Sequence, residues 1–167
     1  MRRFVLLALV LSALVLGGTA GAAVIPNSKD RTFVVTAGHA GAAEIAAGKL
    51  ALTKASDKAT LAFARRMVHD HTMLATKLNQ AAAAVGLTPP ATPTPAQAAA
   101  LRSLGKLSGS AFNAAYRKNQ IAAHQAAVAL FSSESKNGRA PTLKAAASGG
   151  LPTIEMHLKM AQDLPAY

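Results

Sequence analysis

The chain has 167 residues and no cysteine, and its 18 Lys and Arg side chains outnumber seven Asp and Glu side chains. Without cysteine, disulfides, thiolate metal sites and a lipid-modified N-terminal cysteine are excluded. The length suits one domain. Alanine, the best helix former, dominates the sequence, and β-branched residues are sparse and dispersed. We therefore expect an all-α fold.

The first residues have the pattern of an export signal. Arg2 and Arg3 precede an almost uninterrupted apolar run, residues 4–16, and residues 20–22 (AGA) fit a signal cleavage site. The apolar run is shorter than the about 20 residues that a membrane-spanning helix needs. We predict a signal peptide over residues 1–22 and an exported protein, periplasmic or secreted, whose mature part has no transmembrane helix.

The remaining chain is divided into a short linker, residues 23–29, and one domain, residues 30–167. After removal of the predicted signal peptide with Arg2 and Arg3, the chain has 16 basic and seven acidic residues, which gives a net charge of +9. This charge favours anionic partners such as envelope polymers. Scarce aromatic residues and dispersed basic ones disfavour nucleic acid, and a merely solvated basic surface is the alternative.

The first two predicted helices form a hairpin. One helix is predicted over residues 30–55 and the next over residues 58–85, with Asp57 as the N-cap of the second. Each has small or apolar residues at spacings of three and four, which mark one helical face. Glu44 lies within the first of these stripes and His71 within the second.

A long Pro-rich connection follows the hairpin. Gly86 is predicted to end the second helix, and residues 87–109 are long enough to cross the length of a bundle. Within this connection, residues 95–104 are predicted to form a short helix. Thr94 and Gln97 have the spacing of a capping box, with proline at the first helical position.

Two further long helices complete the predicted domain. They are expected over residues 110–135 and 141–164, and their stripes include His124 and His157, respectively. Pro152 follows a pair of glycines, so we expect the last helix to be interrupted and kinked there.

Each of the four long helices therefore carries one metal-capable side chain at or beside its core-facing stripe. At a rise of about 1.5 Å per residue, all four side chains lie near the middle of a four-helix bundle. Because an unpaired polar group in a core is costly, we expect these groups to share one site. Imidazole and carboxylate suit Zn, Cu, Fe or Mn. The predicted metal ligands are Glu44, His71, His124 and His157.

Two alternatives to a four-ligand metal site stay open. The same side chains could form a metal-free polar network, in which case the protein would be an envelope interaction or stress module whose basic surface binds polyanions or a protein partner. Met67 and Met160 share helix faces with His71 and His157 and could add thioether ligands, although core packing is their usual role. No pattern indicates catalytic residues, a substrate, an organic cofactor or an oligomeric state.

Other polar residues are expected to have lesser roles. His39 and His69 fall off the stripes and are predicted to be exposed. Asp70 is turned about 100° from His71 on a helix, so it is predicted to support the site from outside or to lie at the surface. Tyr116 is predicted to pack, with a hydrogen bond into the site as the alternative. Glu134 would be a ligand only if its helix were rotated.

Four segments resemble a family of exported bacterial proteins, domain of unknown function (DUF) 4142, which is grouped with the ferritin-like bundles. They are FVVTAGHAGAAEIAAGKLAL, FARRMVHDHTMLATKL, LSGSAFNAAYRKNQIAAHQAAVALF and LPTIEMHLKMA. The resemblance implies a ferritin-like four-helix fold and a location in the cell envelope, with the family's Glu at Glu44 and its histidines at His71, His124 and His157. The family often has Asp where this chain has Asn113.

The pattern differs from that of di-iron bundles, which use Glu-x-x-His on two helices. Val68 and Ile154 stand three residues before His71 and His157, where that motif has glutamate. A dinuclear ferroxidase-like centre is therefore not expected, and a mononuclear site fits better.

Overall fold

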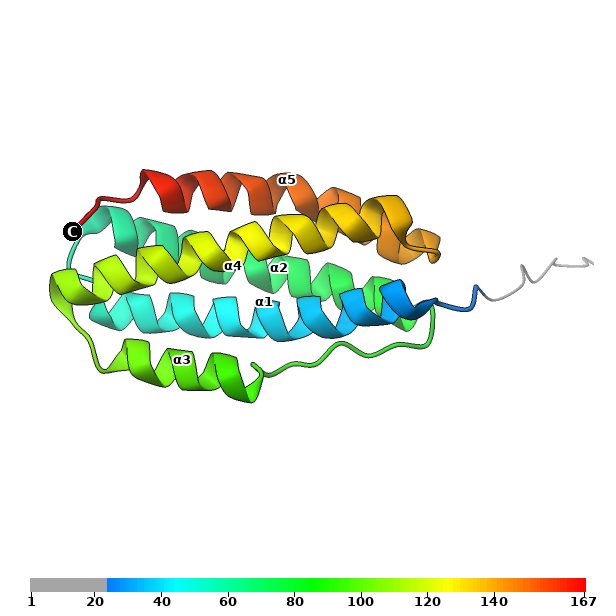
Figure 1. Cartoon of the computed structure of the whole chain (residues 1–167), viewed down its shortest axis with the longest axis horizontal. Helices are drawn as coiled ribbons and strands as arrows, with labels where there is room; N and C mark the ends of the chain where they lie inside the picture. Colours follow the sequence, from blue (N-terminus) through cyan, green and yellow to red (C-terminus); the bar gives the residue numbers. More distant parts are fainter. Residues whose placement is uncertain (1–23) are drawn as a thin grey trace, which may run out of the picture.

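The computed structural model describes residues 24–167, and every helix or strand assigned there is an α-helix (Figure 1). The helices are α1 (Ser28–Lys54), α2 (Lys58–Ala83), α3 (Pro95–Gly105), α4 (Gly109–Asn137) and α5 (Pro141–Asp163). The predicted all-α class is confirmed. The signal predicted for residues 1–22 lies outside the described part. None of the described helices combines the length and apolar character needed to span a membrane.

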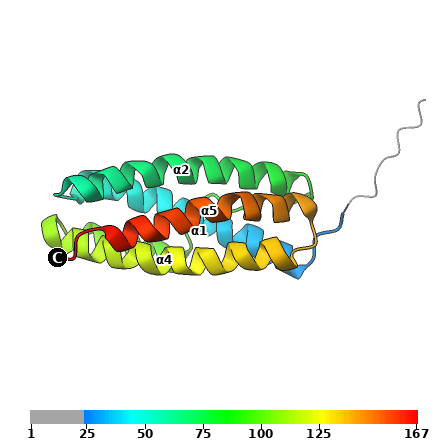
Figure 2. The same ribbon diagram turned by 90° about the horizontal axis from the view of Figure 1, so that it is seen from above.

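The long helices lie side by side as a helical bundle. α1 packs against α2 and α4 packs against α5, and these two hairpins meet through contacts of α1 with α4 and of α2 with α5 (Figures 1 and 2). The connection between α2 and α4 returns along the bundle and carries α3 against α1 (Figure 1). The connection therefore crosses the length of the bundle, for which its length was predicted to be sufficient.

The ends of α2 and α3 follow the predicted capping. Asp57 accepts a hydrogen bond of 2.8 Å from the Thr60 N–H, and Thr94 with Gln97 forms the capping box of α3. Gly86 has a φ of 70°, which glycine adopts without steric cost. The chain thus leaves α2 in the left-handed turn that common C-terminal caps require.

The start of α1 differs from the prediction. The helix begins at Ser28 rather than Asp30, because Asn27 is its N-cap. The Asn27 side chain accepts from the Asp30 N–H at 2.9 Å, and the Asp30 carboxylate accepts from the Asn27 N–H at 2.6 Å. This reciprocal pair satisfies two N–H groups that a helix start otherwise leaves without partners.

The predicted interruption of the last helix is not observed, since α5 continues through Pro152. Gly150 sits where a Cβ atom would lie 3.0 Å from Phe131 Cε1 and 3.2 Å from Leu74 Cδ2. The missing side chain thus lets α5 lie close to both neighbouring helices at this level. The resulting packing contacts help to compensate for the N–H group that Pro152 lacks.

Two apolar clusters fill the bundle core at different levels. One contains Phe63, Met67, Phe112 and Tyr116, and the other contains Phe33, Val34, Leu78 and Leu143. Along each long helix, the predicted site residues Glu44, His71, His124 and His157 fall between the members of these two clusters. The candidate site is therefore a polar layer between two apolar ones.

Glu134 lies far from that polar layer. It is buried near the end of α4, ten positions after His124 and about 15 Å along the helix. Burial and, to a smaller extent, the neighbouring Asp30 together raise the pKa of Glu134 to about 7. Burial alone would raise the pKa of Asp30, but hydrogen bonds from the Ala140 and Asn27 N–H groups lower it on balance. Glu134 therefore holds a proton beside an ionised Asp30.

The close approach of α1 to α2 is tested at Gly48. In Gly48→Ala, the new Cβ would lie 2.8 Å from Val68 Cγ2 and 3.3 Å from the Ala64 carbonyl oxygen. Because valine is stiff in a helix, we expect a loss of about 1 kcal/mol in the free energy of unfolding, measured with urea. In the control Gly149→Ala no atom lies within 4 Å of the new Cβ, so we expect a gain of about 0.5–1 kcal/mol. Stabilisation by both substitutions would contradict this packing.

The protonated Glu134 makes stability depend on pH. Glu134 has a pKa of about 7 in the folded protein, whereas its ordinary value, which applies to the unfolded chain, is 4.5. Because the folded state binds the proton more tightly, the free energy of unfolding should fall as pH rises between these two values. Glu134→Gln cannot ionise, so its stability relative to the wild type should increase over the same range. We expect a change of the order of 1 kcal/mol, reduced by solvent screening. Exposed Glu155→Gln is the control, and equal pH profiles for all three proteins would contradict the assignment.

Candidate metal centre

Three histidines from three helices meet in the middle of the bundle. His71 comes from α2, His124 from α4 and His157 from α5, and each offers a ring nitrogen within 4.8 Å of those of the other two. Their ring centroids are 5.3–5.6 Å apart, and all three side chains are buried. The sequence-predicted histidines are thus brought together, whereas Glu44 lies outside this group of mutually close ligand atoms.

His157 is oriented by an acidic side chain on the neighbouring helix. Its Nε2 lies 3.0 Å from the Asp70 carboxylate. Burial would raise the pKa of Asp70, but hydrogen bonds from Arg66, His69 and His157 lower it well below its usual range. Because an ionised carboxylate only accepts hydrogen bonds, Nε2 of His157 carries the proton. The other ring nitrogen, Nδ1, therefore offers a lone pair when the ring is neutral.

His124 is oriented by its own helix. Its Nδ1 lies 2.8 Å from the backbone carbonyl oxygen of Gln120, one turn earlier. A carbonyl oxygen only accepts, so Nδ1 donates and Nε2 keeps a free lone pair. Fixing the outer nitrogen by a carbonyl or a carboxylate is the usual arrangement around metal-binding histidines.

The inner nitrogens of the three rings have no hydrogen-bond partner among the described residues. They are His71 Nε2, His124 Nε2 and His157 Nδ1, and all three are buried. Burial, with a smaller effect of the neighbouring imidazoles, lowers the pKa of His71 to about 3 and that of His124 to about 4. Burial also lowers the pKa of His157, although Asp70 opposes this change. The cluster is thus neutral at physiological pH, and His124 Nε2 and His157 Nδ1 present lone pairs beside the buried His71 Nε2.

Glu44 forms a second polar group beside the histidines. Its carboxylate accepts a hydrogen bond of 2.7 Å from the Gln120 side chain. Burial raises the pKa of Glu44 to about 7, although the hydrogen bond from Gln120 lowers it in part. Burial also raises the pKa of Tyr116, and the nearby Glu44 charge raises it further. Gln120 therefore connects the two groups, since its backbone holds His124 and its side chain holds Glu44.

The Asp70 carboxylate links the site to the surface. Arg66, one turn earlier on α2, donates to the same carboxylate that holds His157, and half of its side-chain surface is exposed. His69, whose side chain is 74% exposed, places Nδ1 2.8 Å from the other carboxylate oxygen. Asp70 contacts His157, as the first of its two predicted roles requires, and the predicted exposure of His69 is confirmed. The orienting role of Gln120 was not predicted, because no sequence pattern distinguishes it from a packed glutamine.

Other sequence predictions have mixed outcomes. His39 was predicted to be exposed, but it is half-buried, because its Nδ1 lies 2.6 Å from the Thr92 carbonyl oxygen in the Pro-rich connection. Met67 belongs to an apolar core cluster and Met160 packs against that cluster, which agrees with a packing role. Tyr116 is fully buried between aromatic rings, and its hydroxyl has no partner among the described residues.

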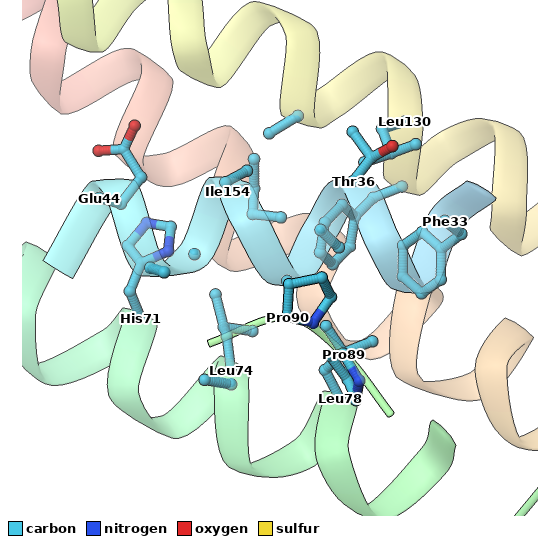
Figure 3. A pocket seen from close by; sticks show the side chains of 18 of the residues that line it. Phe33, Thr36, Glu44, His71, Leu74, Leu78, Pro89, Pro90, Leu130 and Ile154 are labelled. Carbon is cyan, nitrogen blue, oxygen red and sulfur yellow. The ribbon is translucent and has the colours of Figure 1, made fainter. Parts of the chain in front are cut away.

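A cavity of about 390 Å³ opens beside the cluster. Glu44 and His71 line one end, and Phe33 and Leu78 line the other (Figure 3). His124 also lines the cavity. Its remaining walls are mostly apolar and come from the long helices and from the Pro-rich connection. The buried histidines are therefore reachable from an internal space rather than sealed within packed side chains.

This arrangement has the chemistry of a metal site with an open side. Three neutral imidazoles, two of them with an outer nitrogen fixed by a hydrogen bond, are good ligands for transition metals. Three protein ligands also leave room for a further ligand, and the cavity lies on that side.

Comparison with known proteins places the chain in a family. No curated protein and no solved structure matches it. Residues 17–164 match the family described as "Domain of unknown function (DUF4142)", which is nearly the whole chain. The match includes all three histidines, Glu44 and Asp70, as the resemblance of the quoted segments predicted. The chain therefore belongs to the DUF4142 family.

Proposed function

We propose that this protein is an exported metal-binding bundle that holds one transition-metal ion through His71, His124 and His157. The observation that carries this proposal is the convergence of three buried, unpartnered ring nitrogens within 4.8 Å of one another. In a tetrahedral zinc site the nitrogens are about 3.3 Å apart, so modest inward movements of the rings would complete the site. Zn, Cu, Fe and Mn are the candidate ions.

A purely structural polar network explains these contacts less well. Such networks normally satisfy their buried polar atoms, because each unsatisfied one costs about 1–3 kcal/mol. Here the hydrogen bonds of Asp70 and Gln120 satisfy only the outer nitrogens of His157 and His124 and leave the inner ones without partners. A bound cation uses all the inner lone pairs at once, which supports the metal-binding interpretation.

We assign Glu44 to the border of the site rather than to the three-histidine core. It lines the same cavity as His71 and His124, and its carboxylate is held by Gln120 (Figure 3). From there it can accept a hydrogen bond from a water molecule or ligand on the open side of the ion, or approach as a fourth ligand. This placement favours a mononuclear site over a dinuclear one.

We further propose that the fold is ferritin-like and that the protein acts in the periplasm or outside the cell. The two hairpins and the long crossing connection support the first proposal. The N-terminal sequence pattern supports the second. A role in buffering, carrying or sensing a metal in the cell envelope follows from this combination.

A second, independent function is favoured by the basic surface. Within residues 24–167, only Arg66 and Lys159 among the Lys and Arg side chains form ion pairs with acidic side chains. Most basic groups are thus available to an envelope polyanion or an acidic protein surface. Binding to a teichoic-acid-like polyphosphate should weaken strongly between 50 and 300 mM salt, about as expected from Debye screening. Retention that does not change with salt would contradict this function.

The metal proposal predicts one bound ion per chain. Titrating the chelator-treated mature protein with Zn²⁺ in a calorimeter should give about one equivalent, as a single mononuclear site requires. His71→Ala and His157→Ala should each weaken binding by about 100-fold or more, since each removes one ligand. His39→Ala is the matched control and should keep the affinity. Unchanged Zn²⁺ affinity in His71→Ala would refute the site.

The contact of Asp70 with His157 predicts a smaller effect. Asp70→Asn keeps the size of the side chain but removes the charge that orients the ring, so we expect a loss of about 10- to 100-fold in metal affinity. Asp163→Asn changes the same chemistry on exposed α5 surface, where Asp163 pairs with Lys159 at 3.0 Å, and should have no effect. Equal affinities for the two variants would show that Asp70 does not support the site.

A further inference from the structure

The cavity beside the histidines is large and mostly apolar. It holds about 390 Å³ and its walls include Phe33, Leu74, Leu78, Leu130, Phe131 and Ile154. Protein interiors are close-packed and contain few voids larger than a water molecule. A space of this size with apolar walls and a few polar groups at one end is typical of a ligand site.

The volume sets the size of the ligand. An apolar cavity of about 150 Å³ is enough for benzene. By that proportion the cavity here accommodates an apolar group of roughly ten to fifteen carbon atoms. The cavity is also elongated, because Glu44 and Phe33, which line its opposite ends (Figure 3), are separated by about 16 Å along α1. An extended chain fits this shape better than a compact ring system.

The residues at the polar end of the cavity determine which polar head group a bound ligand can have. Glu44 and the Nε2 atoms of His71 and His124 are hydrogen-bond acceptors there, and the nearby Gln120 Oε1 is a further buried acceptor without a partner. A carboxylate head would add a negative charge beside Glu44. An ammonium head would place a positive charge where the metal is proposed to bind. A neutral hydroxyl donates to an acceptor such as Glu44 and also presents an oxygen to a neighbouring cation.

The Pro-rich connection covers part of this cavity. Pro89 and Pro90 line it (Figure 3), and Gly38 lets the connection lie against α1, since a Cβ there would meet Pro90 Cδ at 2.8 Å. The hydrogen bond between His39 and the Thr92 carbonyl oxygen fastens the same segment. These contacts hold the Pro-rich connection in place, so that it closes the side of the cavity that α1 and α2 leave open.

We propose that this cavity binds a neutral amphiphile with an extended apolar chain of roughly ten to fifteen carbons and a hydroxyl head that meets Glu44 and the histidines. This inference goes beyond metal binding, and only its preference for a hydroxyl over an ammonium head rests on the proposed ion, because the apolar walls and Glu44 are present with or without it. The chain occupies the space between Phe33 and Ile154, and the head lies at the polar layer of the bundle.

The test uses 1-decanol with the mature protein, in chelator-treated and Zn²⁺-loaded forms. We expect saturable binding to both forms, detected by calorimetry, with at least tenfold weaker binding of decanoate to the chelator-treated form and of decylamine to the Zn²⁺-loaded form. Intermolecular NOEs from the decanol chain should reach the methyl groups of Ile154 and Leu130. Absence of saturable decanol binding in both forms, or NOEs confined to surface methyl groups, would overturn the proposal.

Paired variants separate the cavity from the surface and from the metal. Ala127→Trp should fill the cavity and weaken decanol binding at least tenfold, whereas Ala129→Trp, on the exposed face of the same helix, should leave decanol affinity within twofold of the wild type.

Glu44→Leu should abolish the preference for decanol over decanoate. Equal affinities in the two Trp variants would overturn the proposal, and the wild-type NOEs decide the case if Ala127→Trp does not fold. Decanol binding retained in His71→Ala, with Zn²⁺ binding lost, would support this ligand site separately from the metal site.

Discussion

The structure depends on how a helical core of small and apolar residues accommodates three buried imidazoles. Burying a polar ring without partners is costly, and here the outer nitrogens of His157 and His124 are held by the Asp70 carboxylate and the Gln120 carbonyl oxygen. These contacts fix the tautomers and leave the inner nitrogens facing one another. In the proposed function, a metal ion at the centre satisfies the inner nitrogens that this layer, which lies between two apolar clusters, leaves without partners.

Much of the architecture follows from local sequence features. The stripe spacing predicted helices that match α1, α2, α4 and α5 to within about two residues at each end. Thr94 and Gln97 predicted the N-terminal cap of α3, and Gly86 predicted the end of α2. The number of residues between each histidine and the end of its predicted helix gave similar heights along the bundle. His71, His124 and His157 were therefore correctly expected to lie at the same level of the bundle. The start of α1 was missed because Asn27 and Asp30 form a capping box with residues other than the usual Ser or Thr and Glu.

The remaining features depend on tertiary packing that the sequence does not encode in any short pattern. Gln120 orients His124 through its backbone within α4, but its side chain reaches Glu44 only because α1 and α4 are adjacent. α5 continues through Pro152 because Gly150 lets it pack closely on Phe131 and Leu74. The cavity likewise arises from the positions of Pro90 and Gly38, which are far apart in the sequence. Helix periodicity therefore predicted that the three histidines lie together but not the cavity beside them.

X-ray absorption spectroscopy of the Zn²⁺-loaded mature protein tests the central claim most directly. The account predicts a first shell that contains about three imidazole nitrogens at about 2.0–2.1 Å, recognisable by multiple scattering from the rings, together with one oxygen ligand on the cavity side. A first shell made only of oxygen atoms would place the ion on surface carboxylates or water. That result would contradict a metal centre formed by His71, His124 and His157.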